Sequence, residues 1–115
     1  MENVKGMLSS THGGSLIFER ILGDLSRPGS DCEYEIRSFV VQGTAETLKP
    51  ADFVIQAEEH GVPQMRHRVI LFGIRKDLAQ KKHEPLARAL LPAVSVNDAI
   101  SGLPSLRSRL SREED

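Results

Sequence analysis

The feature that most constrains the fold is a continuous apolar run at residues 69–74, with the sequence VILFGI. An unbroken run of this length is typical of a β-strand that is covered on both faces, whereas a surface strand alternates apolar and polar residues. Such a strand needs neighbours on both edges. The chain has few other elements to cover it, so the run predicts α/β architecture and favours a chain that is part of a larger α/β domain.

Three further segments supply elements around this strand. Residues 15–26 carry apolar side chains at helical spacing and are followed by Arg27-Pro28-Gly29, which predicts one amphipathic helix. Residues 33–41 begin with alternation and are rich in β-branched and aromatic side chains, so they predict a strand. Residues 53–56 predict a second, shorter strand.

The C-terminal part of the chain carries two helix-start signals. Pro85 is suited to the first turn of a short helix that runs to residue 91 and is closed by Pro92. Ser95 is suited to cap another helix, which carries Asp98 three positions on. Residues 105–115 are expected to form a frayed or truncated end.

Composition excludes several classes of protein. The apolar fraction is 39%, the charged fraction 27% and the formal net charge −1, values typical of a folded soluble domain. No apolar run approaches the roughly 18 residues of a membrane-spanning helix, and no signal peptide is present, which predicts a cytoplasmic protein with no membrane partner. The single cysteine, Cys32, cannot form an internal disulfide bond.

The charges are unevenly distributed along the chain. Residues 1–60 contain 5 Lys/Arg and 10 Asp/Glu, whereas residues 61–90 contain 7 Lys/Arg and 2 Asp/Glu. The basic segment is a candidate for contact with an anion, and a solvated positive face is the alternative.

Two short segments carry side chains suited to recognition chemistry. The first is Glu2-Asn3-Val4. The second contains Gln64, Arg66 and Arg68, which share one face if the segment is extended, with His67 on the other face. Arginine suits planar recognition of a phosphate or a carbonyl, and glutamine both donates and accepts hydrogen bonds. On the residues alone, an exposed terminal Glu2 and a positively charged strand edge remain alternatives.

Taken together, in this order and context, these segments resemble the second half of the catalytic domain of DNA (cytosine-5) methyltransferases. Residues 1–8 look like the family's Glu-Asn-Val motif, and residues 61–75 look like its Gln-x-Arg-x-Arg motif. Residues 94–106 look like the approach to its target recognition region. The resemblance implies a partial Rossmann-like sheet, with residues 1–92 as the second half of the catalytic domain and 93–115 as the truncated start of the target recognition region.

The resemblance also implies a reaction. The family methylates carbon 5 of a flipped cytosine in double-stranded DNA with S-adenosylmethionine, after a cysteine thiolate adds to carbon 6. Glu2 is implied to contact the ring nitrogen N3 and the exocyclic amine, and Arg68 to hold the cytosine carbonyl oxygen. Arg66 is implied to support the nearby glutamate or a backbone phosphate. The base must lie outside the duplex for these groups to reach it.

The remaining motif residues are implied to act on geometry. Gln64 would help order the loop that covers the flipped base, and Asn3 and Val4 would set the position of Glu2. With Glu2, Arg66 and Arg68, these residues form the predicted site.

The sequence departs from the family pattern in two ways. The family's nucleophile lies in a Pro-Cys motif before Glu-Asn-Val, and its glycine-rich cofactor loop lies earlier still; this sequence contains neither. Cys32 has no neighbouring proline and is interpreted as an ordinary thiol. Gly13-Gly14 does not follow a predicted strand, so it is not interpreted as a cofactor loop. We therefore predict that the chain alone is inactive and that a complementary upstream half is a candidate partner.

The setting that fits this pattern is a bacterial or phage-encoded restriction-modification enzyme associated with the nucleoid. Two alternatives remain open at this point, a non-catalytic nucleic-acid-binding module that uses residues 66–88 and a gene remnant. No metal is expected, because the histidines lie far apart in the sequence and a single cysteine supplies no zinc-ligand spacing.

Overall fold

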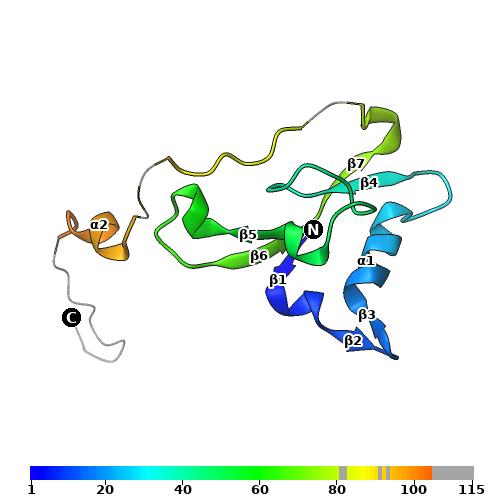
Figure 1. Cartoon of the computed structure of the whole chain (residues 1–115), viewed down its shortest axis with the longest axis horizontal. Helices are drawn as coiled ribbons and strands as arrows, with labels where there is room; N and C mark the ends of the chain where they lie inside the picture. The colour runs from blue at the N-terminus through cyan, green and yellow to red at the C-terminus, as the bar shows by residue number, and fades with distance from the viewer. Residues whose placement is uncertain (81–82, 91, 93, 105–115) are drawn as a thin grey trace, which may run out of the picture.

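The computed structural model describes residues 1–80, 83–90, 92 and 94–104. Short strands, one longer helix and several 3-10 turns make up the fold (Figure 1). In chain order these elements are β1 (Glu2–Val4), η1 (Lys5–Leu8), β2 (Thr11–His12), β3 (Ser15–Leu16), α1 (Ile17–Ser26), β4 (Tyr34–Arg37), η2 (Pro50–Phe53), β5 (Val54–Gln56), η3 (Ala57–His60), β6 (His67–Ile70), β7 (Phe72–Arg75), η4 (Lys76–Leu78) and α2 (Val96–Ile100).

The strands form three small sheets, and every pairing among the described strands is antiparallel. One sheet has the order β1-β6-β5, and the other two are the pairs β2-β3 and β4-β7. The chain is therefore a mixed α/β structure, as predicted. A Rossmann-like sheet is built on parallel strands, and the described pairings do not include any, so that finer part of the expectation stays a prediction.

The apolar run at 69–74 forms two strands instead of one. Leu71 separates β6 from β7, and its backbone pairs with the first residue: the Leu71 N–H donates to the Met1 carbonyl and the Met1 amino group donates to the Leu71 carbonyl, each at 2.9 Å. Strand β6 then has neighbours on both edges, β1 and β5, as expected of a central strand. Val69 and Leu71 are buried, but Ile70 and Phe72 are only half-buried, so coverage of both faces is incomplete.

The hydrophobic core lies between α1 and the sheets. Its buried apolar members, among the described residues, are Met7, Phe18, Ile36, Phe53, Val69 and Leu71. The rings of Phe18, from α1, and Phe53, from η2, lie 5.8 Å apart in a tilted arrangement. Helix α1 ends at Ser26, just before the predicted stop, and its predicted extent is confirmed to within two residues.

The predicted strand over 33–41 is wrong beyond Arg37. Ser38 is fully buried, and its hydroxyl donates to the Asp52 carbonyl while accepting from the backbone N–H groups of Val40 and Val41. A side chain that bonds local backbone in this way competes with the strand ladder. The strand therefore ends in a tight turn at Ser38.

The predicted helix over 85–91 is also wrong for the described residues 85–90, which form no helix. The Leu86 N–H donates to the Phe39 carbonyl at 2.7 Å, and the Ala89 N–H donates to the Glu59 carbonyl at 2.8 Å. In a helix that starts at Pro85, the Ala89 N–H would donate to the Pro85 carbonyl, so its bond to Glu59 is incompatible with that helix. The segment instead lies against the loop that follows β4, at Phe39, and against η3, at Glu59. Residue 91 lies outside the described residues.

Two features near the ends of the chain complete the fold. Gly13 and Gly14, with φ of 61° and 81°, form the turn of the β2-β3 hairpin, which the sequence analysis missed. The predicted helix after Ser95 is confirmed as α2, with Ser95 and Asp98 in a capping box. Helix α2 lies away from the sheets (Figure 1). The predicted frayed end, 105–115, lies outside the described residues.

Candidate active site

The two predicted cytosine-recognition residues meet on one face of the β1-β6-β5 sheet. Val4 pairs with Arg68 and Glu2 pairs with Ile70, so Glu2 and Arg68 are diagonal neighbours on the same face. The Nε of Arg68 lies 2.9 Å from the Oε1 of Glu2. The Glu2 side chain is 54% exposed and that of Arg68 26%, so the pair is held by the sheet and open to a ligand.

Arg68 has donors left after it binds Glu2. Its Nη1 donates to the His67 carbonyl at 2.8 Å, which fixes the plane of the guanidinium. A guanidinium carries five N–H donors, and within the described part of the chain no further partner contacts its Nη2. The site therefore presents a carboxylate acceptor beside a free guanidinium donor.

Asn3 and Val4 lie on opposite faces of β1. Asn3 faces Val69 across the ladder, and its Oδ1 accepts from the Val4 N–H at 2.7 Å. Val4 lies on the Glu2 face, opposite Arg68. The Asn3 bond fixes the backbone directly after Glu2, where β1 passes into η1.

Gln64 and Arg66 are not brought to the Glu2–Arg68 pair. The prediction of an extended segment from 64 to 68 is wrong, because β6 begins only at His67 and Gln64 lies in a bend. Both side chains are exposed, and among the described residues no hydrogen bond or ion pair engages either of them. They project from the loop between β5 and β6.

His67 makes a contact that the sequence analysis missed. Its side chain lies on the face opposite Arg68, as predicted, and its Nε2 lies 2.6 Å from the Oε1 of Glu58. The pKa of Glu58 lies below its ordinary value, first because its own backbone N–H and then because the His67 imidazole favour the charged carboxylate. The turn at Gly61, which has φ of 81°, brings these two residues together, and no residue spacing in the sequence signals this contact.

A family comparison decides what this arrangement belongs to. The model of the C-5 cytosine-specific DNA methylase family matches residues 1–112. The chain belongs to this family.

Individual relatives agree with this assignment. This C-5 cytosine-specific DNA methylase chain is 32% identical over 111 residues to the Type II methyltransferase M.MthTI of Methanothermobacter thermautotrophicus, covering 96% of the chain and 27% of the relative. It is 31% identical to M.BspRI of Lysinibacillus sphaericus, covering 89% of the chain and 20% of the relative. It is 32% identical to M.AquIA of Picosynechococcus sp., covering 90% and 42%. The chain thus spans less than half the length of these relatives, and no solved structure matches it significantly.

The basic segment of the methylase chain is largely neutralised by its own carboxylates. Its described ion pairs are Arg68–Glu2 at 2.9 Å, Arg75–Asp77 at 2.6 Å, Lys76–Glu33 at 2.7 Å and Arg88–Glu59 at 3.1 Å. Lys81 and Lys82 lie outside the described residues. The described part of the basic segment 61–90 therefore does not form a surface of unpaired positive charges.

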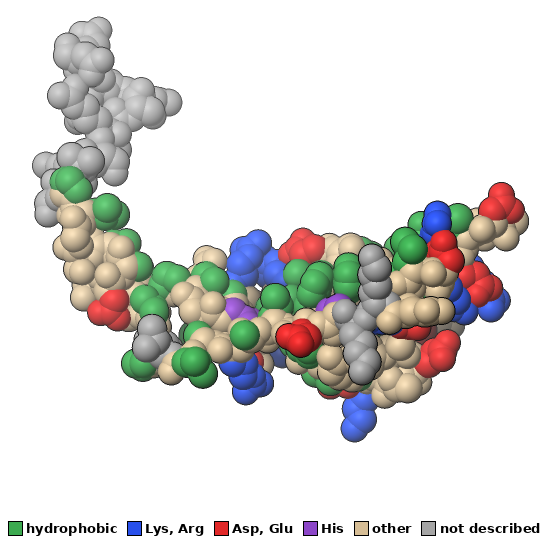
Figure 2. Space-filling model, turned by 90° about the horizontal axis from the view of Figure 1, so that it is seen from above, with side chains coloured by type: hydrophobic (Ala, Val, Ile, Leu, Met, Phe, Trp, Pro, Cys, Tyr) green, Lys and Arg blue, Asp and Glu red, His purple; other side chains and the backbone are tan. Residues whose placement is uncertain are grey.

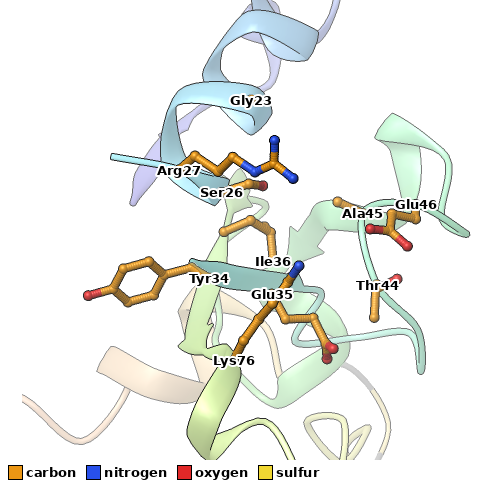
Figure 3. A pocket seen from close by; sticks show the side chains of 10 residues that line it. All are labelled: Gly23, Ser26, Arg27, Tyr34, Glu35, Ile36, Thr44, Ala45, Glu46 and Lys76. Carbon is orange, nitrogen blue, oxygen red and sulfur yellow. The ribbon is translucent and has the colours of Figure 1, made fainter. Parts of the chain in front are cut away.

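A pocket of about 570 Å³ lies between the end of α1, β4 and the loop at 44–46 (Figure 3). Figure 3 shows Arg27 at the top of the view, Lys76 and Glu35 below it, and Glu46 at the right. Arg27 and Lys76 both bind Glu33, at 3.2 and 2.7 Å, so the pocket does not offer unpaired positive charge to an anion. None of the predicted site residues lines it.

Cys32 and Gly13-Gly14, which the sequence analysis does not interpret as the nucleophile or as a cofactor loop, lie in other parts of the fold than the Glu2–Arg68 pair. Cys32 lies beside Arg75 and Lys76, at the end of β7 remote from Arg68. Six residues lie between Arg68 and Arg75 in the chain, and the strands that carry them, β6 and β7, belong to different sheets. Gly13-Gly14 belongs to a hairpin turn and not to a strand-to-helix loop, so these glycines do not fit a cofactor cradle.

Two further tests concern metals and membranes. Within 1–80, 83–90, 92 and 94–104, no group of three or more His, Cys, Asp or Glu side chains is placed to hold a metal ion. No helix in the same part of the chain has the length and apolar character to cross a membrane.

Proposed function

We propose that this chain supplies the cytosine-recognition part of a DNA (cytosine-5) methyltransferase, which transfers a methyl group from S-adenosylmethionine to carbon 5 of a flipped cytosine in double-stranded DNA. The observation that carries this proposal is the Glu2–Arg68 pair at 2.9 Å on an accessible sheet face. Glu2 and Arg68 come from two motifs that are far apart in the sequence, and the pairing of β1 with β6 brings them together.

The geometry suits the edge of a cytosine. That edge offers an amine donor, the ring nitrogen N3 and a carbonyl acceptor in a row. Glu2 accepts from the amine and shares a proton with N3 as the thiolate adds to carbon 6, while the free Nη2 of Arg68 donates to the carbonyl. Because the ladder between β1 and β6 holds both groups, little reorganisation is needed when the base arrives.

Gln64 and Arg66 act on the surroundings of the flipped base in this proposal. Both are exposed on the loop before β6, free of side-chain partners among the described residues. We assign Gln64 to the loop over the flipped base and Arg66 to a backbone phosphate, because Arg66 is not paired with Glu2. Asn3 and Val4 set the backbone that carries Glu2.

The rest of the machinery comes from elsewhere in this proposal. A complementary upstream half supplies the nucleophilic cysteine and the main S-adenosylmethionine loop and completes a Rossmann-like sheet. Residues 1–92 belong to the catalytic domain, and residues 93–115, which include α2, begin the target recognition region. We place the complete enzyme in the cytoplasm, in a restriction-modification system, because the relatives named above are Type II methyltransferases.

A plain nucleic-acid-binding module gains no support from the structure. Such a module would use residues 66–88 as a positive surface, and the described cations there, apart from Arg66, are paired with carboxylates. Salt-dependent binding of DNA needs lysines and arginines that are able to neutralise phosphates.

The test is reconstitution of methyl transfer. The chain is mixed with an upstream polypeptide from a relative that carries the Pro-Cys motif and the cofactor loop, and transfer of labelled methyl groups from S-adenosylmethionine to duplex DNA is measured. We expect no transfer by the chain alone and transfer by the mixture. Arg68→Ala should reduce transfer by about 100-fold or more, as for other lost transition-state donors, with a much smaller change in DNA affinity.

Arg75→Ala is the matched control, since it removes the same charge from the far end of the β6-β7 segment, where Arg75 binds Asp77. Equal losses in the two variants, or equal losses of transfer and DNA affinity in Arg68→Ala, would contradict the proposed role. Methyl transfer by the 115-residue chain alone would contradict the assignment of the nucleophile to a segment outside these residues.

A further inference from the structure

The contact between Glu58 and His67 lies directly behind the Glu2–Arg68 pair. Glu58 belongs to η3, and His67 is the first residue of β6. Their side chains approach to 2.6 Å and are 24% and 32% exposed, so the contact is partly shielded from water. Neither residue belongs to the motif positions to which the proposed function gives a role.

A continuous series of polar contacts, two hydrogen bonds followed by one ion pair, connects this contact to the site. Glu58 Oε1 binds His67 Nε2, the His67 carbonyl accepts from Arg68 Nη1 at 2.8 Å, and Arg68 Nε binds Glu2. Adjacent residues of a strand point to opposite faces. The imidazole is therefore held on one face while the backbone of the same residue orients the guanidinium on the other.

The first part of the loop from 57 to 66 is bound to residues 87–89, because the Glu59 carbonyl accepts from the Ala89 N–H at 2.8 Å and His60 Nδ1 lies 2.9 Å from the Ala87 carbonyl oxygen. Residues 61–66 have fewer restraints. The Ala57 N–H donates to the Arg66 carbonyl at 3.0 Å, and the Val62 N–H donates to the Ala57 carbonyl at 3.3 Å. Gln64 and Arg66 have no side-chain partner among the described residues. Fixing such a loop costs conformational entropy, so a side-chain bond at its base has a direct effect on where β6 begins.

We propose that Glu58 is a positioning residue, which anchors His67 at the start of β6 and thereby holds the Arg68 guanidinium in the plane that it needs to bind Glu2 and a base. The carboxylate of Glu58 is charged at neutral pH, and the hydrogen bonds that lower its pKa, from its own backbone N–H and from His67, favour this charged form. The use of this geometry for cytosine rests on the proposed function, whereas the anchoring itself does not.

The chain offers a matched control for this inference. Glu59 is the next residue in η3, and its carboxylate binds Arg88 at 3.1 Å and not His67. Glu58→Gln and Glu59→Gln each remove one negative charge from the same turn. A difference between the two variants therefore reports the His67 contact and not the charge.

The first measurement is made on the 115-residue chain without DNA. NMR follows solvent exchange of the Arg68 Nε–H, whose nitrogen forms the ion pair with Glu2. In Glu58→Gln we expect exchange to become about two- to fivefold faster, the factor typical of coupling between partly exposed charged groups, and in Glu59→Gln we expect no change. His67→Ala should reproduce the effect. Unchanged Arg68 exchange in Glu58→Gln and His67→Ala, with folded spectra, would overturn the inference.

A second measurement separates this inference from the proposed function. Affinity for a duplex in which the target cytosine lies opposite an abasic site is measured for Glu58→Gln, Arg68→Ala and the double variant. Non-additive losses support positioning of Arg68 by Glu58, and additive losses contradict it. If Arg68→Ala leaves methyl transfer in the reconstituted mixture unchanged while the NMR effect is present, the proposed function fails and the positioning role stands.

Discussion

The β1-β6-β5 sheet buries apolar side chains in the core, whereas the C-terminal arm exposes them. We define the arm as the described residues from 83 to 104. In the sheet Val69 is 0% exposed, and Phe53 beside it is 1% exposed. In the arm Leu90 is 102% exposed and Leu103 66% exposed. Figure 2 shows green side chains along the part of the molecule that leads to α2.

The difference shows which part of the chain organises itself. The sheet has a core and a ladder that hold Glu2 and Arg68 without help from another molecule. The arm is bound through its residues 83–89, where His83 lies against Phe72, the Leu86 N–H donates to the Phe39 carbonyl and the Ala89 N–H donates to the Glu59 carbonyl. Helix α2 has a local cap. Apolar residues left in water beyond that point are typical of a segment that needs further protein to cover it.

The largest expected contrast is in stability. Phe53→Ala removes a buried ring that packs against Phe18, so the free energy of unfolding should fall by about 3–5 kcal/mol. Leu90→Ala should change it by less than about 0.5 kcal/mol, because the side chain is in water. Urea denaturation measures both. Similar losses in the two variants would remove the distinction between sheet and arm.

A smaller effect is expected from the cap of α2. The Ser95 hydroxyl accepts from the Asp98 N–H at 3.1 Å, so Ser95→Ala should destabilise the helix by about 1 kcal/mol. Hydrogen exchange in Val96–Ile100 should become about fivefold faster, while the amides of β6 keep their rates. A parallel change in β6 would mean that arm and sheet unfold as one unit.

The smallest effect is a pH dependence confined to the arm. The pKa of Asp98 lies below its ordinary value of 3.8, first because the Ser95 hydroxyl and then because the Ser95 N–H donates to it. A carboxyl whose pKa is lowered in the folded state stabilises that state above the ordinary value and loses this contribution as the pH falls through the lowered value. NMR titration should therefore show α2 fraying below about pH 4. A normal titration of Asp98 would contradict the cap.

Local patterns predicted part of the fold and failed where distant backbone groups decide. Helix α1 and the Ser95 cap follow from the residues within each segment. The break at Leu71 depends on Met1, and the extended course of 85–90 depends on carbonyls of Phe39 and Glu59. Such partners are far away in the sequence, so periodicity and capping signals do not reveal them.

The candidate site also contains residues that the sequence predicts and a contact that it does not. Glu2 and Arg68 were predicted from two motifs, and strand pairing brings them together. The contact of Glu58 with His67 has no sequence signature, because a ten-residue loop and the turn at Gly61 create it. The prediction that residues 64, 66 and 68 share one face of a strand is wrong, because β6 begins only at His67.

The central claim is that Glu2 handles the proton at cytosine N3, and one variant tests it most directly. In the reconstituted enzyme, Glu2→Gln keeps a hydrogen-bonding side chain on the sheet but cannot share that proton. Single-turnover methyl transfer should fall by about 100-fold or more, with DNA affinity nearly unchanged. Glu46→Gln, an exposed residue away from β1, should retain full transfer. Transfer by Glu2→Gln within about twofold of the parent rate, where proton transfer is expected to contribute far more, would contradict the account.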